Sequence, residues 1–274
     1  MFKKFVYTLL FLLPGSVLAN QPKDWQLGFQ KSASQGMDDI VWFHDYMLLP
    51  VITAIMVFVL FLIGYTCIRY RASRNKEAST TSHNTTIEVL WTLIPCLILI
   101  VLAVPSFKVL YSQDEIPKAD VTIKAVGYQW YWGYEYPDEN IIFDSYMIDE
   151  KDLKEGQPRL LAVDNEVYVP VNKVVKVMIT ANDVLHAWAL PSFEVKRDDV
   201  PGKINETLCK ADRTGTFYGQ CSELCGIKHA FMPITVNVVS EDEYNQWLEE
   251  AKIKFAKEEI NNNIKIAKKI KEIK

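Results

Sequence analysis

The stretch Tyr46-Met-Leu-Leu-Pro-Val-Ile-Thr-Ala-Ile-Met-Val-Phe-Val-Leu-Phe-Leu-Ile-Gly-Tyr-Thr-Cys-Ile68 runs for 23 residues without a charged side chain. A second uncharged run extends from Val89 to Phe107. As helices, both runs are long enough to cross a hydrocarbon layer about 30 Å thick. Lipid offers the backbone no hydrogen-bond partner, so a single segment can cross it only as a helix. The two runs therefore predict transmembrane helices over residues 46–68 and 88–111.

The first 19 residues have the pattern of a secretion signal. Lys3 and Lys4 are followed by the apolar run Phe5 to Leu13 and by Val17-Leu-Ala19, which is typical of a cleavage site. The apolar run is too short to span a bilayer, although a retained N-terminal anchor is the alternative. We therefore expect a mature N-terminus near Asn20, outside the cytoplasm, and an external segment over residues 20–45.

Loop charge gives the same orientation. The connection over residues 69–87 carries four cationic side chains and one acidic one, and such loops remain in the cytoplasm. Everything after Tyr111 is then expected outside again. The predicted location is a bacterial plasma membrane, crossed twice, with both termini on the periplasmic side.

The charge balance of the chain limits the kind of partner it can bind. Between Ser112 and Leu248 there are 13 Lys and Arg against 23 Asp and Glu, which argues against nucleic acid and favours a basic partner. The chain has 13 Phe, 13 Tyr and 7 Trp but only 11 Gly and five Cys. These numbers exclude a disordered chain, a collagen-like repeat and a disulfide-dense scaffold.

The external part, residues 112–240, is predicted to be all-β. Short runs rich in β-branched residues alternate with Pro, Gly, Asn and Asp, at the spacing of a Greek-key barrel. The expected strands are Val121–Val126, Arg159–Val163, Val174–Ile179, Thr216–Gly219 and Ile234–Val239. Residues 241–274 follow as a Lys-rich amphipathic helix, in which Ile253, Ala256, Ile260, Ile264 and Ala267 recur every three or four residues. This helix is either solvated or lies on anionic headgroups or another subunit.

The segment Cys221-Ser-Glu-Leu-Cys225-Gly-Ile-Lys-His229-Ala-Phe-Met232 places two thiols, an imidazole and a thioether within 12 residues. His186 supplies a second imidazole 35 residues upstream. Thiolate and thioether are soft ligands that favour copper, whereas structural zinc sites more often use Cys-x2-Cys pairs. A disulfide between the two Cys is the alternative in an oxidising compartment. The complete set indicates a metal site.

Two thiolates exceed the one that a mononuclear blue-copper site needs. They could instead bridge two copper ions, each completed by one imidazole and one weaker ligand. Met232 would serve one ion, and a backbone carbonyl of the loop Ser222 to Leu224 the other. Such a pair spreads the redox change over two metals and two sulfurs and suits an electron relay.

The sequence resembles subunit II of the haem-copper cytochrome c oxidases over nearly the whole mature chain. The resemblance is carried by Trp42-Phe-His-Asp45, Glu88-Val-Leu-Trp-Thr92, Gly127-Tyr-Gln-Trp-Tyr-Trp-Gly-Tyr-Glu135, Phe143-Asp-Ser-Tyr-Met147, Asp183-Val-Leu-His-Ala-Trp188 and Tyr218-Gly-Gln-Cys-Ser-Glu-Leu-Cys225. It implies a two-helix transmembrane hairpin followed by a cupredoxin-like Greek-key β-barrel. It also implies a binuclear copper centre, CuA, with ligands at His186, Cys221, Glu223 through its carbonyl, Cys225, His229 and Met232.

The same resemblance implies roles for further residues. The Glu223 carboxylate would reach a magnesium ion shared with subunit I, and Glu88 would lie at the mouth of a proton channel. Trp130 would be the residue at which electrons arrive from cytochrome c. The carboxylates of the docking surface would be Glu135, Asp144, Asp164 and Asp183.

In that family, electrons pass from cytochrome c through copper to haem in subunit I, which reduces oxygen to water and translocates protons. The implied partners are therefore subunit I, other oxidase subunits, cytochrome c and the lipid membrane. On the residues alone, the aromatic run at Trp130 could be core, and Glu88 could be a solvated interfacial side chain. Two other functions remain open: a copper-free docking subunit, and a CuA domain serving a different terminal reductase.

Overall fold

The structure is a computed structural model that describes residues 20–113 and 118–256. The predicted signal peptide and the tail beyond Ala256 lie outside the described residues. The chain forms two compact units. One is the helical unit, residues 35–115, and the other combines the N-terminal segment with everything from Ile116 onward.

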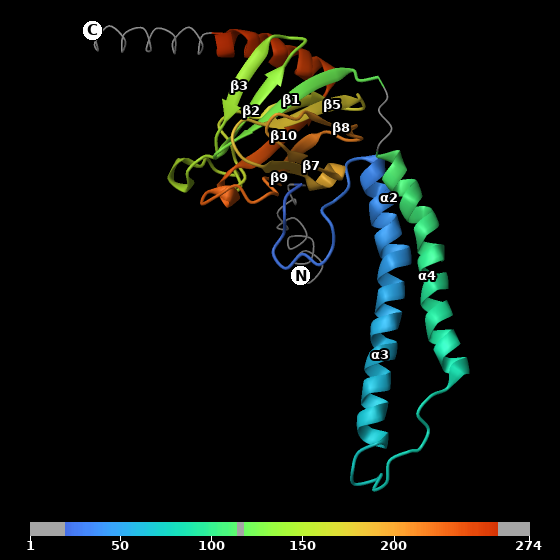
Figure 1. The fold of residues 1–274 in the computed structure, drawn as a ribbon. Coiled ribbons are helices and arrows are strands. Elements are labelled where there is room, and N and C mark those ends of the chain that lie inside the picture. The colour runs from blue at the N-terminus through green and yellow to red at the C-terminus, as the bar shows by residue number, and fades with distance from the viewer. Residues whose placement is uncertain (1–19, 114–117, 257–274) are drawn as a thin grey trace, which may run out of the picture. The chain divides into compact units, whose positions relative to one another are not determined.

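The helical unit contains two long helices (Figure 1). In the first, α2 (Gln35–Phe43), a π turn η1 (His44–Leu48) and α3 (Leu49–Arg69) follow one another without a break. The second is α4 (Thr85–Ser112), which begins at Asn84, whose side chain accepts a hydrogen bond from the N–H of Ile87. Both helices are long and apolar enough to cross a membrane, as the sequence predicts.

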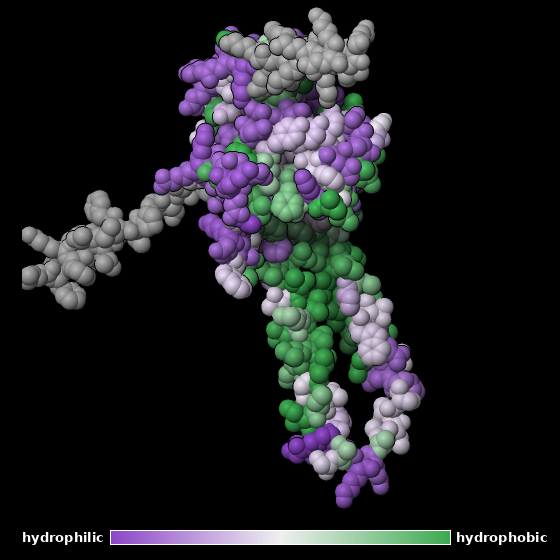
Figure 2. Space-filling view, turned by 90° about the vertical axis from the view of Figure 1, so that its left-hand side faces the viewer, coloured by the Kyte–Doolittle hydropathy of each residue, from purple (hydrophilic) through white to green (hydrophobic). Residues whose placement is uncertain are grey.

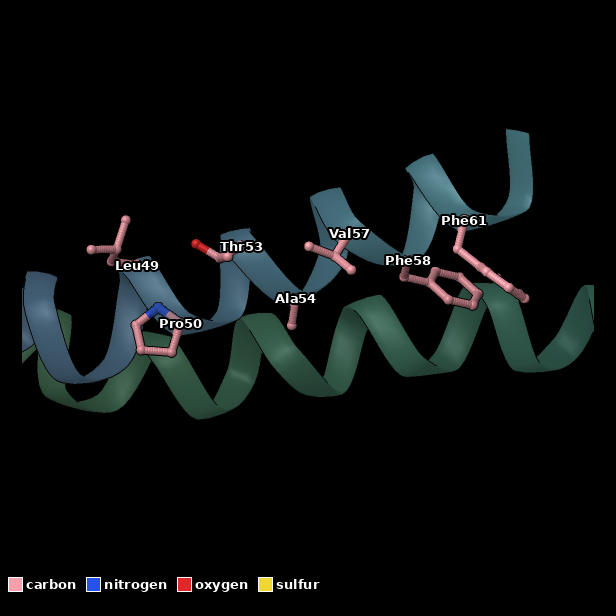
Figure 3. A pocket seen from close by; sticks show the side chains of 7 residues that line it. All are labelled: Leu49, Pro50, Thr53, Ala54, Val57, Phe58 and Phe61. Carbon is pink, nitrogen blue, oxygen red and sulfur yellow. The ribbon is translucent and has the colours of Figure 1, made fainter. Parts of the chain in front are cut away.

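The surface of these helices is apolar over most of its length (Figure 2). Within α3, seven side chains between Leu49 and Phe61 line a shallow apolar pocket, shown in Figure 3. No buried residue occurs in α3 or α4, so each helix presents apolar side chains outward on all sides. A helix of that kind is stable in lipid or against other membrane helices, and not in water.

The second unit, the β domain, is a β-sandwich of short strands. Its strands are β1 (Val121–Tyr128), β2 (Tyr131–Tyr136), β3 (Ile141–Ser145), β4 (Val167–Pro170), β5 (Val175–Ala181), β6 (His186–Leu190), β7 (Val195–Asp199), β8 (Asn205–Cys209), β9 (Gly215–Gln220) and β10 (Pro233–Val239). One sheet has the order β3-β2-β1-β5-β8, a second has β4-β10-β9, and β6 pairs with β7. Short 3-10 turns η2 (Glu150–Asp152), η3 (Pro191–Phe193) and η4 (His229–Phe231) lie between them.

The strands alternate inward and outward side chains, and this alternation forms the core. In β5, for example, every second residue from Val175 to Ala181 is buried. Aromatic side chains of β2 add bulk, since Trp132, Tyr134 and Tyr136 are all buried. The predicted fold class is thereby confirmed: two apolar helices, a cupredoxin-like β domain and a C-terminal helix.

Four of the five predicted strands correspond to β1, β5, β9 and β10, but the predicted strand Arg159–Val163 is wrong. Leu160 adopts a left-handed φ of 65°, and the N–H groups of Leu161 and Ala162 both donate to the carbonyl of Pro158. The segment is therefore a turn that returns the chain for a single bridge between Met147 and Val163. Its apolar side chains are buried because the turn packs inward, which the residue pattern alone does not distinguish from a strand.

The C-terminal helix extends over residues 241–256 in the described chain. Its start is a capping box: Glu243 N–H donates to Ser240 Oγ at 3.3 Å, and Ser240 N–H donates to Glu243 Oε2 at 3.0 Å. One face, including Tyr244, Leu248 and Phe255, is buried on the sandwich, and Phe255 stacks on Phe143 with ring centroids 4.6 Å apart. Of the stripe expected from the sequence, Ile253 and Ala256 lie among the described residues, and both are exposed, away from the buried face; Ile260, Ile264 and Ala267 lie outside the described residues.

Removing this cap should loosen the helix. We expect Ser240→Ala to lower the free energy of unfolding of the β domain by about 1 kcal/mol, because the backbone N–H of Glu243 loses its side-chain acceptor. Urea unfolding of the detergent-solubilised chain measures this. Gln246→Ala, at an exposed position of the same helix, is the matched control; equal stability of the two variants would contradict the capping role.

Candidate metal centre

Four potential ligands converge at one end of the sandwich, three of them at or next to the end of a strand. His186 is the first residue of β6, and Cys221 directly follows β9. Met232 directly precedes β10, while Cys225 lies in the loop between them. All four side chains are buried, including the imidazole, which has no exposed surface. The fifth, His229 in η4, is half-buried.

The contacts form a chain of ligand atoms. His186 Nδ1 lies 3.8 Å from Cys221 Sγ, which lies 3.9 Å from Cys225 Sγ. Cys225 Sγ in turn lies 3.6 Å from His229 Nδ1 and 3.6 Å from Met232 Sδ. The remaining predicted ligand, the carbonyl oxygen of Glu223, is 3.4 Å from Cys221 Sγ. All six predicted ligand positions are therefore brought together.

A disulfide does not explain the two cysteines. Both are free thiols, and their 3.9 Å separation is far from the roughly 2.05 Å of a sulfur–sulfur bond. Burial raises the pKa of the Cys225 thiol, and the neighbouring Cys221 raises it further. The Cys225 thiol therefore holds its proton tightly unless a cation replaces it, and a bound metal ion would do this.

The spacing of the ligand atoms fits metal coordination. In a tetrahedral site with metal–sulfur bonds of about 2.3 Å and metal–nitrogen bonds of about 2.0 Å, neighbouring ligand atoms lie roughly 3.5–3.8 Å apart. The observed separations of 3.6–3.9 Å are close to this. Two thiols, two imidazoles and a thioether are a soft donor set, which suits copper.

His186 is held in place from both sides of its ring. Its Nε2 lies 2.9 Å from Asp183 Oδ1, so Nδ1 is left free to face Cys221. Such a carboxylate partner fixes the orientation of a ligating imidazole. The ring also approaches β1 so closely that a Cβ at Gly127 would lie 2.7 Å from His186 Cδ2. Any side chain at Gly127 would displace the ligand.

The Asp183 carboxylate is itself constrained. It accepts hydrogen bonds from the N–H of Val184 at 2.6 Å and of Gln129 at 2.7 Å. Burial acts to raise the pKa of Asp183, but the hydrogen bonds from His186 and from these two N–H groups outweigh it and lower the pKa. Asp183 is thus an ionised acceptor that joins the turn after β1 to His186. The sequence interpretation had placed it on the docking surface and missed this contact, although the Asp-x-x-His spacing was visible.

The side chains of Gln129 and Trp130 hold the loop that contains Cys225. Gln129 Nε2 and Trp130 Nε1 both donate to the carbonyl of Cys225, at 2.7 and 3.1 Å. The indole lies against Gly226, whose φ is 121° and where a Cβ would be 2.9 Å from Trp130 Cζ2. Glycine is therefore required at this position. Trp130 is half-buried, so one indole contacts both solvent and the ligand loop.

The remaining predicted site residues are more dispersed. Glu135 forms an ion pair with Lys124 at 2.9 Å. Asp144 and Asp164 are exposed. Partial desolvation raises the pKa of Asp144, and repulsion from Asp164 adds to this, despite a hydrogen bond from Tyr146. Glu88 belongs to the first turn of α4, in the helical unit.

Sequence reasoning also missed Asp199, which pairs with His186 across β6 and β7. Its Oδ1 accepts a hydrogen bond from Trp188 N–H at 3.0 Å, while Oδ2 is buried with no hydrogen-bond partner in the described part of the chain. Burial raises the pKa of Asp199 to about 8. Nothing in the local sequence distinguishes this carboxylate from the exposed Asp198 beside it.

This carboxyl makes stability depend on pH. Its pKa in the folded chain exceeds that of an unfolded Asp, about 3.9, so the folded state binds the proton more tightly. The free energy of unfolding should therefore fall as the pH rises from about 4 to about 8. Asp199→Asn should remove this contribution and gain stability relative to the parent at pH 8, but not at pH 4. Parallel unfolding curves for the two proteins at both pH values would contradict the assignment; Asp198→Asn is the control.

The chain is similar to known proteins over both of its units. Residues 121–239 match the family model described as cytochrome c oxidase subunit II, periplasmic domain, and residues 22–109 match the model of its transmembrane domain. The chain is 48% identical over 250 residues to a probable cytochrome c oxidase subunit 2 of Rickettsia prowazekii, covering 90% of this chain and 80% of the relative. It is 46% identical over 253 residues to cytochrome c oxidase subunit 2 of Cereibacter sphaeroides, covering 86% and 83% respectively.

Among solved structures, the chain is similar to the periplasmic domain of subunit II of cytochrome oxidase of Bradyrhizobium japonicum. The identity is 58%, the match covers 52% of this chain and 99% of that chain, and the TM-score is 0.48.

Proposed function

The chain belongs to the cytochrome c oxidase subunit II family, and we propose that within its haem-copper oxidase complex it is the subunit that receives electrons from cytochrome c at a binuclear copper centre. The observation that carries this proposal is the cluster of His186, Cys221, Cys225, His229 and Met232, with neighbouring ligand atoms 3.6–3.9 Å apart. When bound there, copper would supply a one-electron carrier between a soluble donor and haem in subunit I.

The protein's own contribution is to keep this centre rigid and dry. Four of the ligand side chains are buried, and Trp132 Nε1 donates to the carbonyl of Met232 at 3.1 Å, which fixes the thioether residue from behind. Asp183 orients one imidazole, and the Gln129 and Trp130 donors hold the Cys225 carbonyl. Ligands that cannot move keep the reorganisation small when the charge of the centre changes.

Trp130 offers a short hydrogen-bonded route from the surface to the ligands. The half-buried indole donates directly to the carbonyl of Cys225, whose thiol is a ligand. An electron that arrives at the indole therefore crosses one hydrogen bond to the ligand loop. Exposed carboxylates at Asp144 and Asp164 would steer a basic cytochrome c towards this side, with a rate that falls as salt rises. Glu135 and Asp183 belong to the same proposal, although both already have partners.

Two further roles follow from family membership. Glu223 combines a carbonyl directed at Cys221 with a half-buried side chain, so its carboxylate is available to a magnesium ion shared with subunit I. Glu88 begins a membrane-crossing helix and would open a proton path into subunit I. The β domain and both termini would lie on the periplasmic side of the plasma membrane.

A copper-free docking subunit is the main alternative from another class. It would have no use for two buried free thiols next to two imidazoles and a thioether, because a cysteine that only packs acts as a small apolar residue, which Ala or Val would replace. A CuA domain serving another reductase would share the ligands. The two apolar helices and the match to the transmembrane family model favour the oxidase.

Replacing one thiol tests the bridge. Cys225→Ser should abolish the thiolate–copper absorption and the copper EPR signal of the intact complex while leaving the β domain folded by circular dichroism. Cys209→Ala, which removes a buried thiol of β8 from the same core, is the control and should keep both signals. Unchanged spectra in Cys225→Ser would exclude the bridging assignment.

The route through Trp130 has its own test. Trp130→Ala should slow steady-state oxidation of cytochrome c at least tenfold, with a far smaller change in the copper spectrum, because the indole and its hydrogen bond are lost but all ligands remain. Trp130→Phe keeps an aromatic ring without the donor and should give an intermediate rate. Wild-type turnover in both variants would remove this residue from the route.

A further inference from the structure

An apolar groove runs between the two long helices of the helical unit. One wall is formed by Tyr46 and Met47 of η1 with Pro50 and Val51 of α3, and the other by five aliphatic side chains of α4 within residues 94–102. Its volume is about 420 Å³. Apart from the Tyr46 hydroxyl and the Met47 thioether, every lining side chain is pure hydrocarbon. Both walls belong to the same compact unit.

The two helices do not fill this groove themselves. Packing between them is concentrated where α2 meets α4, whereas α3 makes few contacts with α4. Leu97 and Val101 line the groove and yet are 60% and 62% exposed. An empty groove with such walls would forfeit the dispersion contacts of its lining, so apolar matter must occupy it in a membrane. The available occupants are a lipid chain and a further helix.

The dimensions of the groove suit a single hydrocarbon chain. From Ile94 to Leu102, α4 rises by about 12 Å, so a volume of about 420 Å³ corresponds to a mean cross-section of roughly 35 Å². An α-helix about 10 Å in diameter occupies roughly 80 Å² and cannot enter. A polymethylene chain about 4–5 Å wide can. The length of the groove is also close to the roughly 15 Å of hydrocarbon in one leaflet.

One end of the groove has the character of the headgroup region. Tyr46 is 74% exposed and is the first residue of the uncharged run, where tyrosine rings are enriched in membrane helices. The preceding residue, Asp45, is an exposed carboxylate whose Oδ1 lies 2.7 Å from His44 Nδ1. At this end of the helix pair, residues 35–48 and 106–113 together carry three Asp and one Lys. This balance attracts an ammonium group and repels an anionic headgroup.

We propose that the groove binds one acyl chain of a phospholipid whose headgroup carries a primary amine. The chain lies between α3 and α4, the glycerol region is beside Tyr46, and the ammonium group is near Asp45. The lipid fills the space that the two helices leave and keeps them at a fixed separation. This site uses no residue of the copper centre, so the two proposals stand or fall independently.

A photo-crosslinker identifies the occupant. A diazirine amino acid is placed at position 101 in the intact complex, which is then extracted, washed in detergent and irradiated. Mass spectrometry should find a phospholipid adduct at position 101. Val104, also on α4, is 72% exposed and does not line the groove, so the same probe there should give detergent adducts only. A polypeptide adduct at position 101, or no phospholipid adduct there, would overturn the proposal.

Filling the groove tests the site from the side of the protein. Val101→Trp should lower the phospholipid retained per complex at least threefold, measured by native mass spectrometry after the same wash, because the indole takes the place of the acyl chain. Val104→Trp adds the same side chain outside the groove and should retain lipid as the parent does. Equal retention in the two variants would contradict the site.

The headgroup has a separate test. The complex is reconstituted in vesicles of equal parts phosphatidylethanolamine and phosphatidylglycerol, and the lipid that it retains after washing is identified. Phosphatidylethanolamine should predominate, and Asp45→Asn should reduce its excess over phosphatidylglycerol at least threefold. Glu77→Gln, which removes a carboxylate from the loop at the other end of the helices, should not. A predominance of phosphatidylglycerol, or an unchanged excess in Asp45→Asn, would overturn the proposal.

Discussion

Two buried thiols held 3.9 Å apart, without a bond between them, are the constraint on which the β domain depends. As packing residues they offer no more than other small apolar side chains, whereas the proposed copper ions, bound to both sulfurs, would explain their arrangement. The fold supplies the geometry by strand ends: β6, β9 and β10 each deliver one ligand at or next to a terminal residue. Because strand ends are fixed by the ladders behind them, the ligand loop inherits the rigidity of the sandwich.

Contacts behind the ligands explain why particular residues surround them. Asp183 joins the turn between β1 and β2 to the imidazole of His186 through the Gln129 N–H, and the Gln129 and Trp130 side chains join the same turn to the carbonyl of Cys225. One short segment thus touches both halves of the centre. Gly127 completes it, since the imidazole fills the space that a side chain would occupy. The surface indole and the buried ligands are therefore parts of one hydrogen-bonded unit.

The two membrane helices and the ligand loop could be predicted from the sequence, because the residues that define each of them are close together in the chain. Uncharged runs longer than a bilayer predict the two helices, and Cys, His and Met within 12 residues predict the ligand loop. The segment around Leu160 is a turn, although its apolar residues predict a strand. An apolar run indicates that side chains are buried, but not which backbone conformation buries them. Asp199 could not be assigned because the N–H of Trp188, 11 residues away, meets it only through the register of β6 and β7. The contact of Asp183 with the Gln129 N–H spans 54 residues and was equally invisible, although its spacing to His186 is local.

The central claim is that two copper ions share the thiols of Cys221 and Cys225. Electron paramagnetic resonance of the purified, partly oxidised complex, combined with copper analysis, tests it most directly. We predict two copper ions at this centre and one unpaired electron with hyperfine coupling to both nuclei. A signal with coupling to a single copper nucleus, or a complex that purifies with this chain and without copper in it, would contradict the account.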